Sequence, residues 1–98
     1  MDIKIPDEVQ CGAHTYSIVY NNKLDRIERM RGISNHFLQK LELDSGEEGT
    51  RLMGTLVHEF VHIADRIFNN QSMNEETVEA IGEGLTHILL SMGIRFVR

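Results

Sequence analysis

The sequence is poor in three features that would each indicate a particular class of protein. Its only cysteine is Cys11, which excludes a disulfide framework and fits a reducing compartment. Ten basic residues stand against 15 acidic ones, and the net charge of −5 without a basic cluster argues against a nucleic-acid partner. No apolar run is long enough to span a bilayer, and no signal peptide stands at the start. We therefore expect a cytoplasmic protein with neither a nucleic-acid nor a membrane partner.

The rest of the composition is that of an ordinary globular domain, with 41% hydrophobic and 26% charged residues. A chain of 98 residues is large enough for one core but too small for a separate substrate-binding lobe. We expect a single domain over 1–98, made of a strand region over 1–44 and helices over 45–70 and 72–93. Any substrate cleft must then lie against the edge of this core.

The most informative stretch is 58–62, which reads HEFVH and forms an HExxH motif. Two His residues four positions apart lie on one face of a helix, so both imidazoles can reach one Zn²⁺ while Glu59 activates a zinc-bound water. On a helical wheel, His58 and His62 share a narrow polar arc with Arg51, Thr55 and Asp65, and apolar residues fill the rest. Such a division is typical of a core helix with one face open to a cleft. The alternative, a surface helix with a harmless His spacing, does not explain it.

Three segments before the motif have the composition of strands: 3–5 as an edge strand, 13–20, and 37–43. The segment 23–31 is compatible with either a short helix or a hairpin arm. We expect the strand over 37–43 to line the cleft and to hold an extended peptide by strand addition. His36 and His14 either contact the substrate or are solvated turn residues, which are more common. Cys11 is an ordinary thiol or, less favoured, a thiolate that silences a zinc site.

Two capping signals delimit the helices. Ser45 with Glu48 predicts an N-terminal capping box and an acidic first turn for the motif helix, which should end near Phe68. Ser72 with Glu75 predicts the start of a last helix that continues to about 92–93. Since the connection is short, the two helices should be antiparallel neighbours. The apolar stripe of the last helix comprises Val78, Ile81, Leu85, Ile88, Leu89 and Met92.

A catalytic zinc needs a third protein ligand and leaves the fourth position for water. On the wheel of the last helix, Glu79 lies at the margin of the apolar stripe, so we rank it first. Glu83 comes next, followed by Glu75 and Glu76. For Asp65 we expect a supporting role, as the hydrogen-bond acceptor of a ligand imidazole or as the ion-pair partner of an arginine.

The run HEFVHIAD, followed after a short loop by NEETVEAIGEGLTHIL, resembles the small bacterial and phage zincin-like proteins related to the ImmA/IrrE metallopeptidases. The resemblance implies a gluzincin-type α+β core, with a small, mostly antiparallel sheet packed on two antiparallel helices. It implies zinc bound by His58, His62 and Glu79, with Glu59 as general base, and a peptide or protein substrate. It also suggests a bacterial or phage source, where some relatives cleave regulatory proteins such as repressors.

The leading hypothesis is thus a zinc metallopeptidase, a hydrolase that cleaves peptide bonds through a zinc-activated water with a Glu general base. The main alternative is a phage or mobile-element zinc-binding regulatory or interaction protein without peptidase activity. A third is an interaction domain that binds no metal. Stabilisation of the oxyanion needs a further donor, and the sequence leaves five candidates: His36, Tyr16, Tyr20, His87 and Arg51.

Overall fold

A computed structural model describes residues 1–22, 24 and 31–98. In this part of the chain the elements are β1 (Asp2–Lys4), β2 (Glu8–Cys11), β3 (His14–Asn21), β4 (Gly32–Asn35), β5 (Lys40–Asp44), α2 (Gly49–Phe68), α3 (Glu75–Ser91) and β6 (Arg95–Val97). The predicted α+β class is confirmed. The question of a helix or a hairpin arm over 23–31 lies almost wholly outside the described residues.

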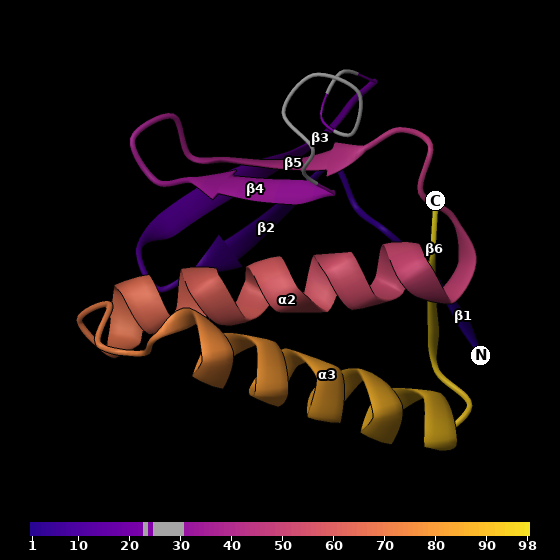
Figure 1. Ribbon diagram of the computed structural model, residues 1–98. Helices are drawn as coiled ribbons and strands as arrows, with labels where there is room; N and C mark the ends of the chain where they lie inside the picture. The colour runs from indigo at the N-terminus through magenta and orange to yellow at the C-terminus, as the bar shows by residue number, and fades with distance from the viewer. Residues whose placement is uncertain (23, 25–30) are drawn as a thin grey trace.

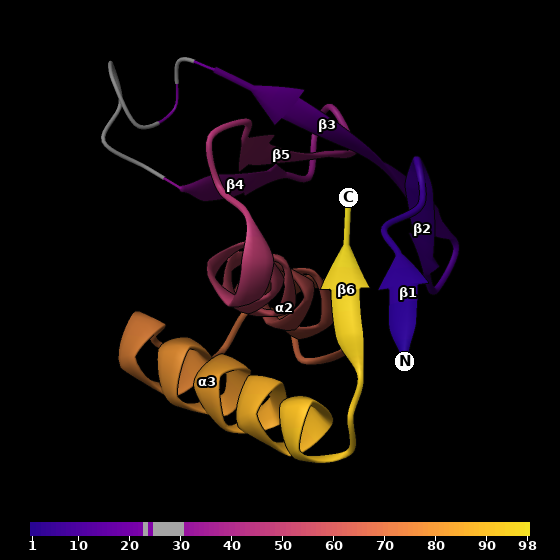
Figure 2. The same ribbon diagram turned by 90° about the vertical axis from the view of Figure 1, so that its right-hand side faces the viewer.

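The four central strands form a sheet in the order β2-β3-β5-β4. The β2/β3 and β5/β4 pairs are antiparallel, whereas β3 and β5 run parallel. A second, two-stranded ribbon pairs β1 in parallel with β6, so the first and the last strand lie side by side, with the N- and C-termini at opposite ends of the ribbon (Figure 2). This order makes β4 an edge of the described sheet.

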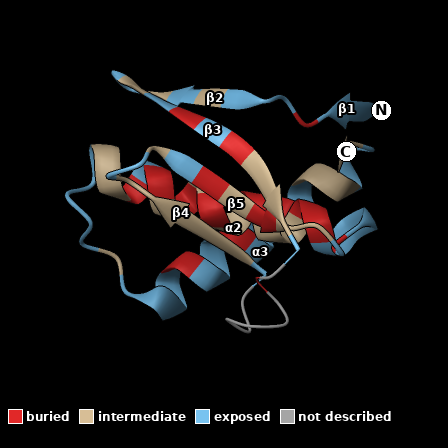
Figure 3. Cartoon of the chain, turned by 90° about the horizontal axis from the view of Figure 1, so that it is seen from above, coloured by how far each residue is buried: buried red, intermediate tan, exposed pale blue. Residues whose placement is uncertain are grey.

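The elements are stacked as sheet, α2 and α3, with α2 in the middle (Figure 1). Tyr16 and Ile18 on β3, like Leu41 and Leu43 on β5, are two residues apart and turn the same face of the sheet towards α2. Leu52, Leu56 and Ile63 of α2 complete this core. Burial is therefore concentrated on α2 and the strands above it, while α3 is mostly exposed (Figure 3).

Both helices end as predicted but begin differently. The N-cap of α2 is Glu48, which makes no side-chain cap hydrogen bond, and the first turn holds no acidic residue. The predicted capping box with Ser45 is therefore wrong, because 44–47 form a separate turn in which buried Glu47 pairs with Arg31. The helix α3 is capped by Asn74, whose Oδ1 accepts a hydrogen bond from the backbone N–H of Thr77 (2.8 Å), and not by Ser72.

One predicted strand begins later in the structure than expected, and this changes which strand borders the cleft. The segment predicted at 37–43 forms β5 only from Lys40 onwards, because Phe37 and Leu38 are exposed turn residues. Since β5 is interior to the sheet, the edge strand that faces the cleft is β4. This strand was not predicted from the sequence. The short strands β2 and β6 were missed as well.

The helix α3 packs on α2 through a narrow face of Val78, Gly82 and Thr86. A Cβ on Gly82 would lie 3.2 Å from the Cα of His58, so glycine permits the close approach of the two helices. Of the predicted apolar stripe only Val78 belongs to this contact, since its other members are exposed or only partly buried. Neither described helix combines the length and the apolar character needed to cross a membrane.

Candidate metal centre

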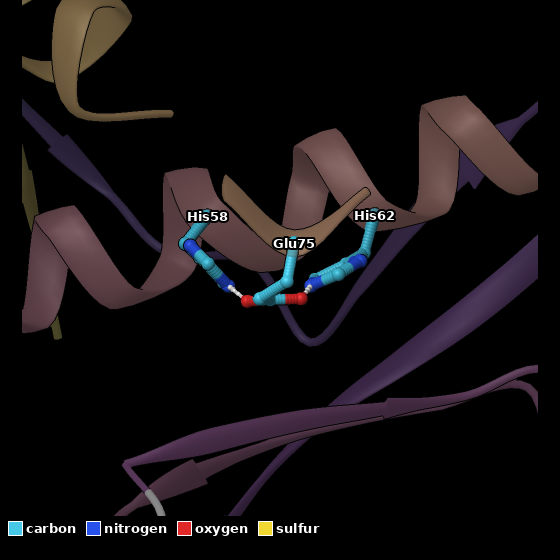
Figure 4. A group of neighbouring side chains, drawn as sticks. All are labelled: His58, His62 and Glu75. Atoms are coloured by element: carbon cyan, nitrogen blue, oxygen red, sulfur yellow. Dashed lines mark ion pairs between the residues drawn. The ribbon is translucent and has the colours of Figure 1, made fainter. Parts of the chain in front are cut away.

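Three side chains from the two helices converge on one point (Figure 4). His58 and His62 extend from the same face of α2, and Glu75 comes from the first turn of α3. The Nε2 atoms of His58 and His62 each lie 3.0 Å from a different carboxylate oxygen of Glu75. The ligand-type atoms of the three residues all lie within 4.8 Å of one another.

This group of side chains could hold a metal ion. Two imidazole nitrogens and one carboxylate are a common set of three protein ligands, which leaves the fourth position of a tetrahedral ion for water. The two histidine side chains are 26% and 31% exposed, so the site is open to solvent on one side. Cys11 lies on β2 and does not belong to this group.

The loop between the helices delivers Glu75 to the histidines. Its anchor is Asp65, a buried residue whose Oδ1 accepts hydrogen bonds from Asn69 Nδ2 (2.9 Å) and from the backbone N–H of Met73 (3.3 Å). Its carbonyl oxygen also accepts from the backbone N–H groups of Asn69 and Gln71. Asp65 thus holds both ends of the loop and sets where α3 begins.

This role replaces the one expected from the sequence. Asp65 was predicted to contact a ligand imidazole or an arginine, but its carboxylate is turned to the loop. This carboxylate, near the end of α2, accepts from the partly buried backbone N–H of Met73, which would otherwise lose its partner. The nearby Arg66 donates from Nη1 to Gln71 Oε1 (2.8 Å).

The acidic residues of α3 occupy different places. Glu75 is the one brought to the histidines, whereas Glu79, ranked first from the sequence, is exposed and lines the cleft one turn further along the helix. Glu83 lines the cleft beyond it, and Glu76 is exposed. Of the three zinc ligands predicted from the sequence, His58, His62 and Glu79, the structure therefore brings together only the two histidines.

Glu59 is almost fully buried, with 6% of its surface exposed, and lines the cleft beside both histidines. Burial raises the pKa of its carboxyl, while His62, His58 and a hydrogen bond with the Ser34 side chain act in the opposite direction. The contact with Ser34 was not foreseen. It follows from the close passage of β4 over α2, because a Cβ on Gly32 would lie 2.7 Å from Thr55 Cγ2 and 3.3 Å from Glu59 Cγ.

The centre lies in a cleft of about 1,240 Å³ bounded by α2, α3 and the edge strand β4 with the turn that follows. Four of the five candidate oxyanion donors line it: Tyr16, His36, Arg51 and His87. The fifth, Tyr20, does not line the cleft. The centroid of its ring lies 3.8 Å from the guanidinium carbon of Arg98. The geometry therefore leaves four candidate donors in the cleft.

No protein-family model, no curated protein and no solved structure matches this chain.

Proposed function

We propose that this protein is a zinc-dependent peptidase of the kind that its motif resembles, the zincin-like proteins related to the ImmA/IrrE family. The proposal rests on the placement of Glu59. A buried carboxylate is costly unless it is paired or used, and Glu59 lies in the wall of a peptide-sized cleft, between two residues that can hold a metal. A purely structural zinc site needs no such group.

We propose His58, His62 and Glu75 as the three zinc ligands. Glu75 takes the place that the sequence reading gave to Glu79, because its two carboxylate oxygens already lie 3.0 Å from the two imidazoles. When bound, zinc supplies a Lewis acid that activates water and polarises the peptide carbonyl. Glu79 remains the alternative third ligand and lies close by in the same cleft.

Glu59 acts as the general base in this proposal. It takes a proton from the attacking water and then delivers it to the amine that leaves. The Ser34 side chain hydrogen-bonds to this carboxylate, and both residues line the cleft. The edge strand β4 offers the substrate backbone a partner for strand addition, since it is the edge of the described sheet beside the cleft. With one cysteine, which is free, we place the enzyme in the cytoplasm.

The test combines zinc content with hydrolysis of a fluorogenic peptide library by wild type and by Glu59→Gln. We expect about one zinc per chain in both proteins. Hydrolysis should fall by about 10²- to 10⁴-fold in the variant, because only the proton acceptor is lost. Glu76→Gln, an exposed change outside the cleft, is the matched control. Zinc without hydrolysis in the wild type would leave a metal-binding regulatory protein, and absence of zinc would contradict the proposal entirely.

A further inference from the structure

His36 follows directly after the edge strand β4. Alternate residues of a strand share one face, and along this strand Gly32 meets Thr55 and Glu59 while Ser34 bonds to Glu59. The next position on the same face is 36, two residues further along. His36 indeed lines the cleft, in the turn directly after β4. It is therefore placed about one strand repeat, roughly 6–7 Å along the chain, beyond the contact with the proposed base.

The ring of His36 is held by Tyr16. The phenol oxygen lies 2.5 Å from Nδ1 of His36, and the tyrosine is buried, with 1% of its surface exposed. Burial raises the pKa of the Tyr16 phenol, so it keeps its proton. Among the described residues, His36 is the hydrogen-bond partner of this hydroxyl. A buried O–H that only accepted a bond would leave its proton unpaired, so Tyr16 donates and Nδ1 accepts.

This bond fixes the tautomer of His36. When Nδ1 of a neutral imidazole accepts, the proton is on Nε2. Nothing in the described part of the chain hydrogen-bonds to Nε2 of His36, so this N–H is free for a ligand in the cleft. Burial lowers the pKa of His36, and the charges of Arg66 and His14 lower it further, which favours the neutral ring.

The neighbouring His14 is held in a matching way but does not line the cleft. The side-chain amide nitrogen of Gln39 donates to its Nδ1 at 3.1 Å, and its ring meets that of His36 edge to face at 5.0 Å. Since it is absent from the cleft wall, His14 supports the position of His36 without access to a substrate. It serves as an internal control of the same residue type.

We propose that His36, fixed by Tyr16 as the neutral Nε2–H tautomer, donates a hydrogen bond to the carbonyl oxygen of the substrate peptide as negative charge develops on it. His36 is then a catalytic residue and Tyr16 a positioning residue. The inference rests on the proposed peptidase function. It selects one donor from the four candidates in the cleft, because Tyr16 already donates its proton to His36, and Arg51 and His87 are exposed. A preorganised N–H is the better donor to a developing oxyanion.

The first experiment measures the tautomer of His36 in the metal-free protein by ¹⁵N NMR of the imidazoles. We expect the proton on Nε2 at pH 7 in the wild type, and a mixture of both tautomers in Tyr16→Phe. Tyr20→Phe, which removes a hydroxyl outside the cleft, should leave the His36 signals unchanged. A proton on Nδ1, or a charged ring at pH 7, would overturn the inference whatever the protein's activity.

The second experiment measures binding of a phosphinic pseudopeptide, whose anionic phosphinate imitates the carbonyl under attack, to the zinc-loaded protein. His36→Asn should weaken binding by about 10- to 100-fold, with zinc content unchanged, whereas His14→Asn should alter it less than about threefold. Thermal unfolding of each variant checks that it is folded. Equal affinity in wild type and His36→Asn, or no phosphinate binding by a zinc-loaded wild type, would overturn the inference. A wild type that takes up no zinc would contradict the proposed function and, with it, the role of His36 at the oxyanion. The tautomer, which is measured without metal, distinguishes that failure from a wrong assignment of the His36 proton.

Discussion

The molecule holds two pairs of histidines that look alike and differ in what their nitrogens meet. The ring centroids of His58 and His62 lie 4.8 Å apart, and those of His14 and His36 lie 5.0 Å apart. In each pair the rings meet edge to face. In the first pair both Nε2 atoms face the carboxylate of Glu75. In the second pair both Nδ1 atoms face uncharged groups, the Tyr16 hydroxyl and the Gln39 amide.

The comparison shows that the partner, more than the residue type, decides the chemistry of an imidazole. A carboxylate that faces two Nε2 atoms forms, with them, a group of three potential metal ligands. Such a group can release its protons when it binds a metal cation. A hydroxyl or amide that donates to Nδ1 occupies the lone pair and leaves only an N–H to offer. The first pair is thus suited to bind metal and the second to donate hydrogen bonds.

The largest expected effect separates the two pairs by their affinity for zinc. His62→Ala should weaken zinc binding by more than about 100-fold, because it removes one of three protein ligands. His36→Ala should retain about one zinc per chain. Competition with a chromogenic chelator measures both. Loss of zinc from His36→Ala but not from His62→Ala would reverse the assignment of the pairs.

The next effect concerns the carboxylate that distinguishes the first pair. Glu75→Gln should lower zinc affinity by about 10- to 100-fold, since an uncharged amide is a weaker ligand than a carboxylate. Glu79→Gln and Glu83→Gln are the matched controls, from the same helix and the same cleft. If Glu79→Gln lost zinc and Glu75→Gln kept it, the ligand would be the residue favoured by the sequence alone.

A smaller effect is expected where the loop fixes the start of α3. Asp65→Ala should lower the free energy of unfolding by about 1–3 kcal/mol, because it leaves the partly buried N–H of Met73 without its acceptor. Denaturant unfolding measures this loss, with the exposed Glu76→Ala as control, for which we expect a change within about 0.5 kcal/mol. An unchanged stability in Asp65→Ala would show that the loop does not depend on this carboxylate.

The smallest effect is the dependence of stability on pH through the second pair. Because the pKa of His36 is lower in the folded protein than its ordinary value of 6.5, the unfolded chain binds the proton more readily. The contribution of His36 to the stability of the fold is complete above pH 6.5. It is lost as the pH falls through the pKa that His36 has in the folded protein. The melting temperature should therefore fall more steeply between pH 8 and 5 in wild type than in His36→Asn. Parallel curves would contradict the lowered pKa.

The fold class and the motif helix could be predicted because their signals are local. The apolar arc of α2 and its end at Phe68 follow from residue spacing over consecutive turns. The edge strand β4 could not be predicted, since Gly32 and Ser34 are poor strand formers and are placed there by contacts with Thr55 and Glu59, distant in sequence.

The third ligand was missed for a related reason. The wheel of α3 was oriented by its apolar stripe, but the helix packs through Val78, Gly82 and Thr86, a face rotated by roughly 70° from the centre of the stripe. The small residue Gly82 allows α3 to approach α2 more closely than the large residues of the apolar stripe would. This rotation turns Glu75 towards the histidines and leaves Ile88 and Met92 exposed. Sequence periodicity locates an apolar face but does not say which face a neighbour will choose.

The division of the three proposed ligands between two helices has a thermodynamic consequence. Glu75 belongs to α3, which adds only Val78, Gly82 and Thr86 to the buried residues, whereas both histidines belong to the well-packed α2. An ion held by all three would cross-link the helices, and only the folded chain could bind it so. By mass action, free zinc at 100 times its dissociation constant would add about 2.7 kcal/mol to the stability. The docking of α3 would then follow the zinc supply of its surroundings.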